Sequence, residues 1–213
     1  MEMQSRPTLW LERGISLLMV GYFIFGYLPI NAFNKARGIY HIVALPFESQ
    51  IPFISAFILG YLLVYGSILW IYYLVPSWEI FKKLAWGFFW VTTIHYIIFV
   101  LFPVKMIWRP EITNPQNFFE LLSQGFFHLD NPFNCFPSLH VAYPTLATVF
   151  AWRYFPRWRY WFALMAILTA ISVVLIKQHY ILDAAGGMVT SLLIGVWITQ
   201  KKTLLQSLGF ATS

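Results

Sequence analysis

Six long apolar runs follow one another along the chain, separated by shorter stretches that hold most of the polar side chains. A helix that crosses the hydrocarbon layer of a bilayer needs about 20 mostly apolar residues, and within lipid a helix satisfies its own backbone hydrogen bonds. The pattern therefore predicts an all-α polytopic membrane protein that forms one domain over residues 1–213. The predicted spans are Gly14–Phe33, Pro52–Val75, Leu84–Phe102, Ser138–Phe155, Tyr160–Ile176 and Ile181–Thr199.

The longest connection between the predicted spans, residues 103–137, contains a shorter helical pattern. Its apolar residues at helical spacing are Phe118, Leu121, Leu122 and Phe126. They predict an amphipathic helix over Pro115–Phe127 that lies on the membrane surface before the fourth span. A helix that packs on its own protein fits the same spacing.

The composition agrees with a membrane protein and argues against other classes. Hydrophobic residues make up 59% of the chain and charged residues 10%, whereas a soluble domain carries about 25% charged residues. The net charge of +6 comes from cations at the ends of apolar runs, where they fit membrane flanks and phosphate contacts rather than a nucleic acid. The single cysteine, Cys135, excludes a disulfide within the chain and is expected to be buried.

Charge also orients the predicted spans. Glu2, Glu12 and the length of the first apolar run argue against a cleaved signal peptide, so we expect the first span to be retained. With six spans, nine Lys and Arg residues, among them Arg6, Lys201 and Lys202, fall on the side of the chain ends and five on the other side. Because cytoplasmic loops carry the excess of Lys and Arg, we expect both termini in the cytoplasm. The three polar runs described next then face the extracytoplasmic (periplasmic or luminal) side.

His179 and Asp183 stand at the start of the sixth span. Four residues apart on a helix, they would share one face, where the carboxylate can accept the Nδ1 proton of the imidazole and leave Nε2 free as a nucleophile. The same face continues through the small residues Gly187, Ser191 and Gly195, which would let a neighbouring span pack closely. The alternative is that His179 and Asp183 only pair with each other at a helix end.

Two further runs offer groups for a phosphate. Ser138, which follows Pro137, would begin a helix whose N–H groups and hydroxyl could bind an anion, and His140 could act as a general acid. Lys105 and Arg109, at helical spacing, would share a face on which the guanidinium binds phosphate oxygens in pairs. The alternatives are an ordinary N-cap followed by an interfacial histidine, and two cations that snorkel at the end of the third span.

A metal site is the rival chemistry for these runs. Their two histidines and Asp183 could supply three ligands. The positive charges of Lys105, Arg109 and Lys177 favour an anion over a cation, so we predict no metal and no cofactor. His95, inside an apolar span, is expected to be a hydrogen-bonded packing residue.

The three runs resemble the signature of the type 2 phosphatidic acid phosphatase superfamily, which reads KxxxxxxRP, then PSGH, then SRxxxxxHxxxD. Here Arg109-Pro110 matches the end of the first motif, and Pro137–His140 matches the second with leucine in place of glycine. The third motif is matched by Ser172, His179 and Asp183. The resemblance covers the C-terminal half of the chain, and its membrane branch shares the six-span layout.

Two positions depart from this signature. Phe102 stands where the first motif has lysine, and Lys105 could reach the same pocket from a neighbouring helix face. Val173 stands where the third motif has arginine, and Lys177 could replace that charge. We expect Val173→Arg to leave turnover similar or to raise it. The form Lys-Gln-His-Tyr-x-x-Asp with Val173 is similar to the branch that contains inositol phosphorylceramide synthase and its bacterial relatives.

The resemblance implies an enzyme in which His179 attacks phosphorus to form a phosphohistidine, Asp183 orients it and His140 protonates the leaving group. The side chains that would hold the phosphate oxygens are Lys105, Arg109, Ser138 and Lys177. Hydrolysis would then make this a metal-independent phosphatase for a lipid such as phosphatidate, phosphatidylglycerol phosphate or a polyprenyl phosphate or pyrophosphate. The alternatives are a phosphotransferase that passes a phosphoryl or phospho-head group from a lipid to an alcohol, and a non-catalytic lipid-binding membrane protein.

Overall fold

The computed structural model describes residues 9–207, with side chains up to residue 200. Over this range the chain is helical and holds no β-strand, apart from an isolated parallel bridge between His41 and Val104. The α-helices are α1 (Leu9–Arg37), α2 (Ile58–Leu74), α3 (Trp78–Leu101), α4 (Phe118–Leu129), α5 (Leu139–Tyr154), α6 (Arg159–Leu175) and α7 (Ile181–Ser207). Two 3₁₀ helices, η1 (Glu48–Gln50) and η2 (Ser55–Phe57), precede α2.

Each of the six apolar runs forms a helix, and the amphipathic pattern forms α4. Within the described residues, four helices are long and apolar enough to cross a membrane, namely α1, α2 extended back to Ser55, α3, and α7 up to Gln200. The other two are shorter, with 16 residues in α5 and 17 in α6. The helices therefore fit an integral membrane protein, and by length and composition alone they support four crossings rather than six.

The starts of α2 and α3 differ most from the prediction, by six residues each, and α1 begins at Leu9 rather than Gly14. α2 begins at Ile58 rather than Pro52, because η2 precedes it and the N–H of Ile54 donates to the carbonyl of the last residue of α6 at 2.9 Å. α3 begins earlier than predicted, at Trp78, because the side chain of Ser77 caps it.

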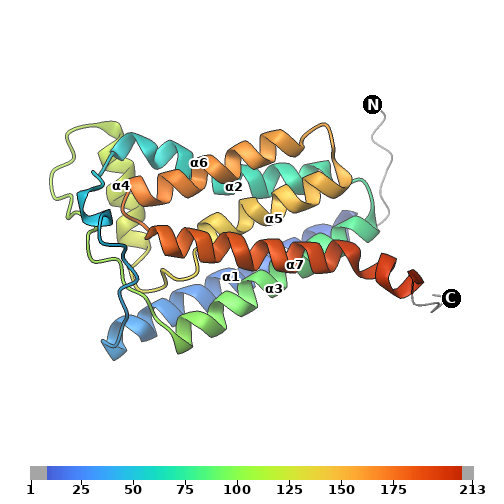
Figure 1. Ribbon diagram of the computed structural model, residues 1–213, viewed down its shortest axis with the longest axis horizontal. Helices are drawn as coiled ribbons and strands as arrows, with labels where there is room; N and C mark the ends of the chain where they lie inside the picture. The colour runs from blue at the N-terminus through green and yellow to red at the C-terminus, as the bar shows by residue number, and fades with distance from the viewer. Residues whose placement is uncertain (1–8, 208–213) are drawn as a thin grey trace.

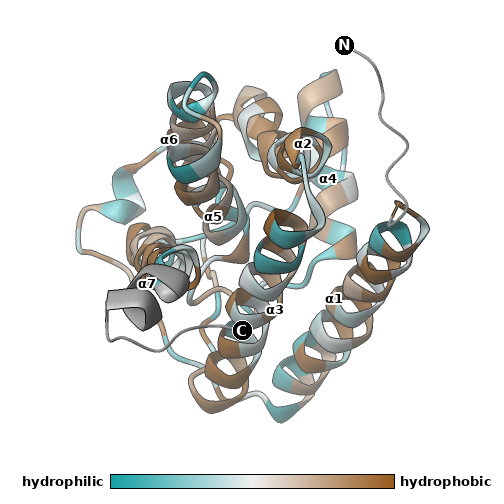
Figure 2. Cartoon of the chain, turned by 90° about the vertical axis from the view of Figure 1, so that its right-hand side faces the viewer, coloured by the Kyte–Doolittle hydropathy of each residue, from teal (hydrophilic) through white to brown (hydrophobic). Residues whose placement is uncertain are grey.

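The α-helices other than α4 run along the long axis of the molecule, and α4 lies across one end of them (Figure 1). α5 packs against α2, α3, α6 and α7, while α1 packs on α3 at the margin of the bundle, as the view along the helices shows (Figure 2). The connections 38–57, 102–138 and 176–180 gather at the end that carries α4. All three polar runs consequently lie at one end of the bundle.

The stripe of small residues on α7 faces α5, which confirms the predicted close packing. A Cβ atom added at Gly187 would collide with the backbone of Ser138, and one added at Gly195 would lie 3.0 Å from Cγ1 of Val149. The close approach of these two helices brings the run that holds Ser138 and His140 next to the run that holds His179 and Asp183.

Many large apolar side chains are exposed on the outside of the bundle, as expected for contact with lipid. Large exposed side chains include Leu17, Leu18, Phe25, Leu69, Trp86 and Leu193. Glu2 and Arg6, which entered the predictions for the N-terminus, lie outside the described residues, as do the side chains of Lys201 and Lys202.

Asn117 caps α4, because its side chain accepts from the N–H of Glu120 at 3.0 Å, and the carboxylate of Glu120 accepts from the N–H of Gln116 at 2.8 Å. The side chains that pack on the protein are Phe119, Leu122 and Phe126. Those that are exposed include Phe118, Leu121 and Leu129. α4 therefore packs on the protein along one edge and presents an apolar edge outward.

Candidate active site

The turn between α6 and α7 carries His179 and places it before α7 rather than on it. Lys177 adopts a left-handed conformation, with φ of 56°. The N–H groups of Gln178 and His179 both donate to the carbonyl of Val173, at 2.9 and 3.0 Å. The prediction that His179 and Asp183 share a face of one helix is therefore wrong, because α7 begins only after this turn.

The imidazole of His179 lies between a backbone carbonyl and a buried carboxylate. Its Nδ1 atom is 2.9 Å from the carbonyl oxygen of Cys135 and 3.5 Å from Oδ2 of Asp183. Asp183 is thus adjacent, as predicted, but the Cys135 carbonyl is the nearer acceptor for the Nδ1 proton. Asp183 is fully buried and accepts from the N–H of Tyr180 at 2.8 Å, which fixes its carboxylate beside the imidazole.

Ser138 and His140 stand at the start of α5. The hydroxyl of Ser138 accepts from the N–H of Val141 at 3.4 Å, which confirms the N-cap. The N–H of Ser138 donates to the carbonyl of Asp183 at 2.9 Å. This N–H therefore ties α5 to α7 and is not available to an anion.

The two predicted histidines are in contact, and a tyrosine joins them. Nδ1 of His140 lies 3.1 Å from Nε2 of His179. Nε2 of His140 lies 2.8 Å from the hydroxyl of Tyr61, a buried residue of α2. Sequence reasoning missed Tyr61, because a tyrosine inside an apolar span has no pattern that separates it from packing residues.

Arg109 reaches the turn that carries His179. Its guanidinium donates to the side-chain oxygen of Gln178 and to the carbonyl of Asp130, and it lies 4.8 Å from the ring centre of Phe127. A planar, forked cation in this place is suited to hold phosphate oxygens. Sequence reasoning missed Gln178 and Asp130, since both residue types are common in turns.

Lys105 and Arg109 do not share a helical face, which corrects the prediction. Their segment forms no helix. It lies between Pro103 and Pro110, and the N–H of Lys105 donates to the carbonyl of His41 at 3.1 Å. The ammonium of Lys105 lies 4.8 Å from the ring centre of Tyr40 and 4.9 Å from that of Phe133.

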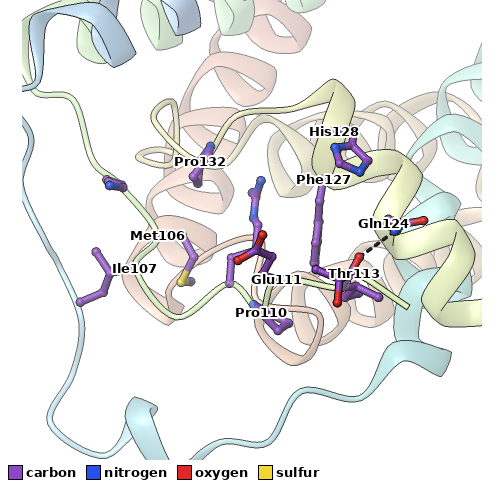
Figure 3. Close-up of a pocket in the computed structure, with 12 residues that line it drawn as sticks. Met106, Ile107, Pro110, Glu111, Thr113, Gln124, Phe127, His128 and Pro132 are labelled. Atoms are coloured by element: carbon purple, nitrogen blue, oxygen red, sulfur yellow. Dashed lines mark hydrogen bonds between the residues drawn. The ribbon is translucent and has the colours of Figure 1, made fainter. Parts of the chain in front are cut away.

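Lys105 and Arg109 nevertheless line the same pocket, which has a volume of about 640 Å³. Its walls are the extended segment on one side and α4 on the other (Figure 3). The polar residues of the lining are Lys105, Arg109, Glu111, Thr113, Gln124 and His128. Arg109 links this pocket to the histidine pair, because it also contacts Gln178.

The ammonium of Lys177 faces η1. It donates to the carbonyl of Glu48 at 3.3 Å and lies 5.8 Å from the ring centre of Trp108. Burial lowers the pKa of Lys177, and the negative charge of Glu48 acts in the opposite direction. The carboxylate of Glu48 accepts from the N–H of Ile181 at 3.1 Å, so these contacts anchor the start of α7.

The loop before α5 is held to α1 by polar contacts. The hydroxyl of Tyr27 donates to Oδ1 of Asp130 at 2.7 Å, and Nδ2 of Asn34 donates to Oδ1 of Asn134 at 2.9 Å. Burial raises the pKa of Asp130, and the positive charge of Arg109 acts against this. Because Arg109 donates to the carbonyl of Asp130, α1 helps to position Arg109.

Three buried donors also raise the question of a metal. The ligand atoms of Cys135, His179 and Asp183 lie within 4.8 Å of one another. Burial raises the pKa of the Cys135 thiol well above its ordinary value, and the charge of Asp183 adds to this, whereas a metal binds the thiolate. Nδ1 of His179 already faces the carbonyl of Cys135. The three residues therefore fit the orientation of His179 by its neighbours better than they fit the binding of a metal.

Val173, at the position where the resembling motif has arginine, belongs to the core. It is fully buried in a cluster with Ile58, Tyr61 and Val141. An arginine there would place a charge without a partner in an apolar environment. We therefore abandon the expectation that Val173→Arg leaves turnover similar or raises it. His95 is a fully buried packing residue, as predicted, with Nδ1 2.6 Å from the carbonyl of Val91.

A histidine pair beside an arginine, at one end of an apolar helical bundle, supplies groups that can attack a phosphate, move a proton and hold anionic oxygens. Comparison with protein families agrees: the chain matches the PAP2 superfamily over residues 43–197 and belongs to it. This membership indicates a phosphatase-type enzyme, and it covers every helix of the site but not α1. Comparison with curated proteins and with solved structures finds no match.

Proposed function

We propose that this protein hydrolyses the phosphate ester or pyrophosphate of a lipid without a metal ion, through a phosphohistidine on His179. The observation that carries the proposal is the 3.1 Å contact between Nδ1 of His140 and Nε2 of His179, in a chain that belongs to the PAP2 superfamily. One histidine can attack phosphorus while the other moves the proton.

The surroundings of His179 suit it to this attack. The carbonyl of Cys135 holds the Nδ1 proton, which leaves a lone pair on Nε2. The buried carboxylate of Asp183, 3.5 Å from Nδ1, stabilises the positive charge that the imidazole gains when Nε2 binds phosphorus. His140 protonates the leaving oxygen and then takes a proton from water, which releases phosphate.

Arg109 and Lys105 are the cations that we propose for the phosphate oxygens, because both line the pocket and Arg109 reaches Gln178. Lys177 and Ser138, predicted as further phosphate ligands, have other partners in the structure. We assign them the task of holding the turn before α7 and the start of α5, which keeps the two histidines together.

We also propose that α5 and α6 cross the membrane despite their length, which makes six crossings in a single domain. α5 is enclosed by four other helices, so its ends need not reach lipid. The excess of Lys and Arg at the end opposite the site favours cytoplasmic termini and an extracytoplasmic site. The outward edge of α4 would then lie at the outer membrane surface.

A phosphotransferase is the second candidate function. The pocket of about 640 Å³ beside Arg109 has six polar or charged residues among the twelve that line it and could hold an alcohol acceptor. The third motif, with Val173 in place of arginine, is similar to the inositol phosphorylceramide synthase branch. Both candidates share the phosphohistidine step and differ in what removes the phosphoryl or phospho-head group.

A turnover assay on the protein purified in detergent tests the proposal. Phosphatidic acid, phosphatidylglycerol phosphate and a polyprenyl pyrophosphate are offered with and without inositol, and a chelator is present throughout. Phosphate release without acceptor that is lost in His179→Ala, but kept in the control His41→Ala at an exposed histidine, supports the phosphatase. Product formed only with acceptor supports the transferase. Turnover that survives in His179→Ala would contradict both.

A further inference from the structure

The hydroxyl of Tyr61 is bonded to the histidine that the proposed mechanism uses as its acid. Tyr61 is 1% exposed, and its oxygen lies 2.8 Å from Nε2 of His140. Its ring centre lies 4.7 Å from that of His140 and 5.3 Å from that of Phe126 in α4. α2 and α4 therefore hold the ring in place, and its hydroxyl meets the imidazole nitrogen that faces away from His179.

The hydrogen bonds around the two histidines fix which nitrogens carry protons. A carbonyl oxygen only accepts hydrogen bonds, so Nδ1 of His179 carries a proton and Nε2 of neutral His179 has a lone pair. The bond from this Nε2 to Nδ1 of His140 therefore needs a proton on Nδ1 of His140. Nε2 of His140 is left to Tyr61, whose hydroxyl can donate to a neutral imidazole and accept from a cationic one.

We propose that Tyr61 is a positioning residue that makes Nδ1 of His140 the nitrogen that gives up and takes back the catalytic proton. This inference rests on the function proposed above. Without the phenol, the Nε2–H of cationic His140 would lose its acceptor, which disfavours the charged form in this buried place.

The proton and electron balance of the reaction follows from this arrangement. Nε2 of His179 forms the bond to phosphorus, and the bond from phosphorus to the leaving oxygen breaks. The leaving oxygen keeps that electron pair and takes the proton from Nδ1 of cationic His140, which becomes neutral with its Nε2–H donated to Tyr61. Water then attacks phosphorus and gives its proton to Nδ1 of His140, and the bond to His179 breaks.

The dependence of kcat on the leaving group distinguishes a role of Tyr61 in proton transfer from a merely structural role. The experiment compares Tyr61→Phe with the wild type on an alkyl phosphate and on an aryl phosphate that carries the same hydrocarbon tail. The aryl oxygen leaves as a weak base and needs little protonation. We expect kcat to fall on the order of 100-fold for the alkyl ester and less than about threefold for the aryl ester. Equal losses on both esters, or none on either, would overturn the inference.

Tyr143→Phe is the matched control, because it removes another buried phenol hydroxyl, 2.9 Å from Oγ1 of Thr92, and should give no leaving-group effect. If Tyr61→Phe does not fold, ¹⁵N NMR of the histidines in the wild-type protein still tests the inference. His140, assigned from the signal lost in His140→Gln, should carry a proton on Nδ1 at rest, and a bare Nδ1 would overturn the inference. Because the tautomer is read without turnover, this result is independent of the proposed function, which fails separately if His179→Ala remains active.

Discussion

Nδ1 of His140 lies 3.1 Å from Nε2 of His179, although the two residues are 39 positions apart in the chain. Two features at the crossing of α5 and α7 bring them together. The N–H of Ser138 donates to the carbonyl of Asp183 at 2.9 Å, and Gly187 leaves room for the backbone of Ser138. The spacing of the histidines therefore depends on a helix crossing that only glycine allows.

Replacing Gly187 should disrupt this crossing. A Cβ atom there would collide with the backbone of Ser138, which cannot rotate aside as a side chain can. We expect Gly187→Ala to lower kcat at least about tenfold, because small displacements of reacting groups are costly. The control is Gly66→Ala in α2, where a Cβ atom meets nothing within 4 Å and alanine favours the helix by about 1 kcal/mol. Similar activity in the two variants would contradict this account.

Replacing Arg109 with lysine should lower activity more than replacing Lys105 with arginine. The guanidinium of Arg109 makes two hydrogen bonds from different nitrogens, to Asp130 and Gln178, which one ammonium cannot reproduce. The ammonium of Lys105 lies between two aromatic rings, a place that a guanidinium also suits. We therefore expect Arg109→Lys to lower kcat/KM about 100-fold and Lys105→Arg less than about fivefold. Steady-state kinetics on one lipid phosphate measures both, and the reverse order would be inconsistent with the assigned roles.

Asp130 should make the stability of the protein dependent on pH. Burial raises the pKa of its carboxyl, so the folded state binds this proton more tightly than the unfolded state. The contribution of Asp130 to the free energy of unfolding is therefore lost as the pH rises from the ordinary carboxyl pKa through the raised pKa of the folded state. Asp130→Asn keeps an oxygen that can accept from Tyr27 and removes the titration. We expect the variant to gain in Tm relative to the wild type between about pH 4 and about pH 7, measured by thermal unfolding in detergent. A Tm difference that is the same at both pH values would refute the assignment.

The sequence predicted the helices and the candidate residues His179 and Asp183, because both leave local patterns. Apolar runs indicated the helices of the bundle, and the third motif indicated His179 and Asp183. Tyr61 and the carbonyl of Cys135 were not predictable in this way: one resembles any packing residue of an apolar span, and the other is a backbone atom that every residue has. The extended conformation at Lys105 is held by a backbone hydrogen bond to His41, a tertiary interaction that spacing along the chain does not reveal.

The two edges of α4 should serve different purposes. Phe118 is 62% exposed, whereas Phe126 packs on Tyr61 with ring centres 5.3 Å apart. We expect Phe118→Ser to lower activity on a long-chain lipid phosphate in vesicles and to leave a short-chain soluble ester unaffected, because only the former needs the membrane surface. Phe126→Ala should lower both activities, since it loosens the ring that faces His140. Equal losses on the two substrates in Phe118→Ser would remove the guiding role of α4.

α1 lies outside the region that matches the PAP2 superfamily, yet it should be needed for the site. Asn34 is fully buried, and its Nδ2 donates at 2.9 Å both to the carbonyl of Phe99 and to Oδ1 of Asn134. Asn34→Leu fills the same space and leaves those two acceptors without their donor, which should cost about 1–3 kcal/mol in unfolding free energy. Because the loop that holds Asn134 also presents the carbonyl that accepts from Arg109, kcat/KM should fall as well.

Phe25→Leu is the control for α1, since this residue is 82% exposed on the outward face of the helix and should leave both quantities unchanged. If Asn34→Leu lowered stability while kcat/KM stayed at the wild-type value, α1 would be a stabilising addition to the bundle and not a support of the site. If both fell together and the loss of activity persisted well below the unfolding temperature, the position of Arg109 would depend on a helix that the family match does not include.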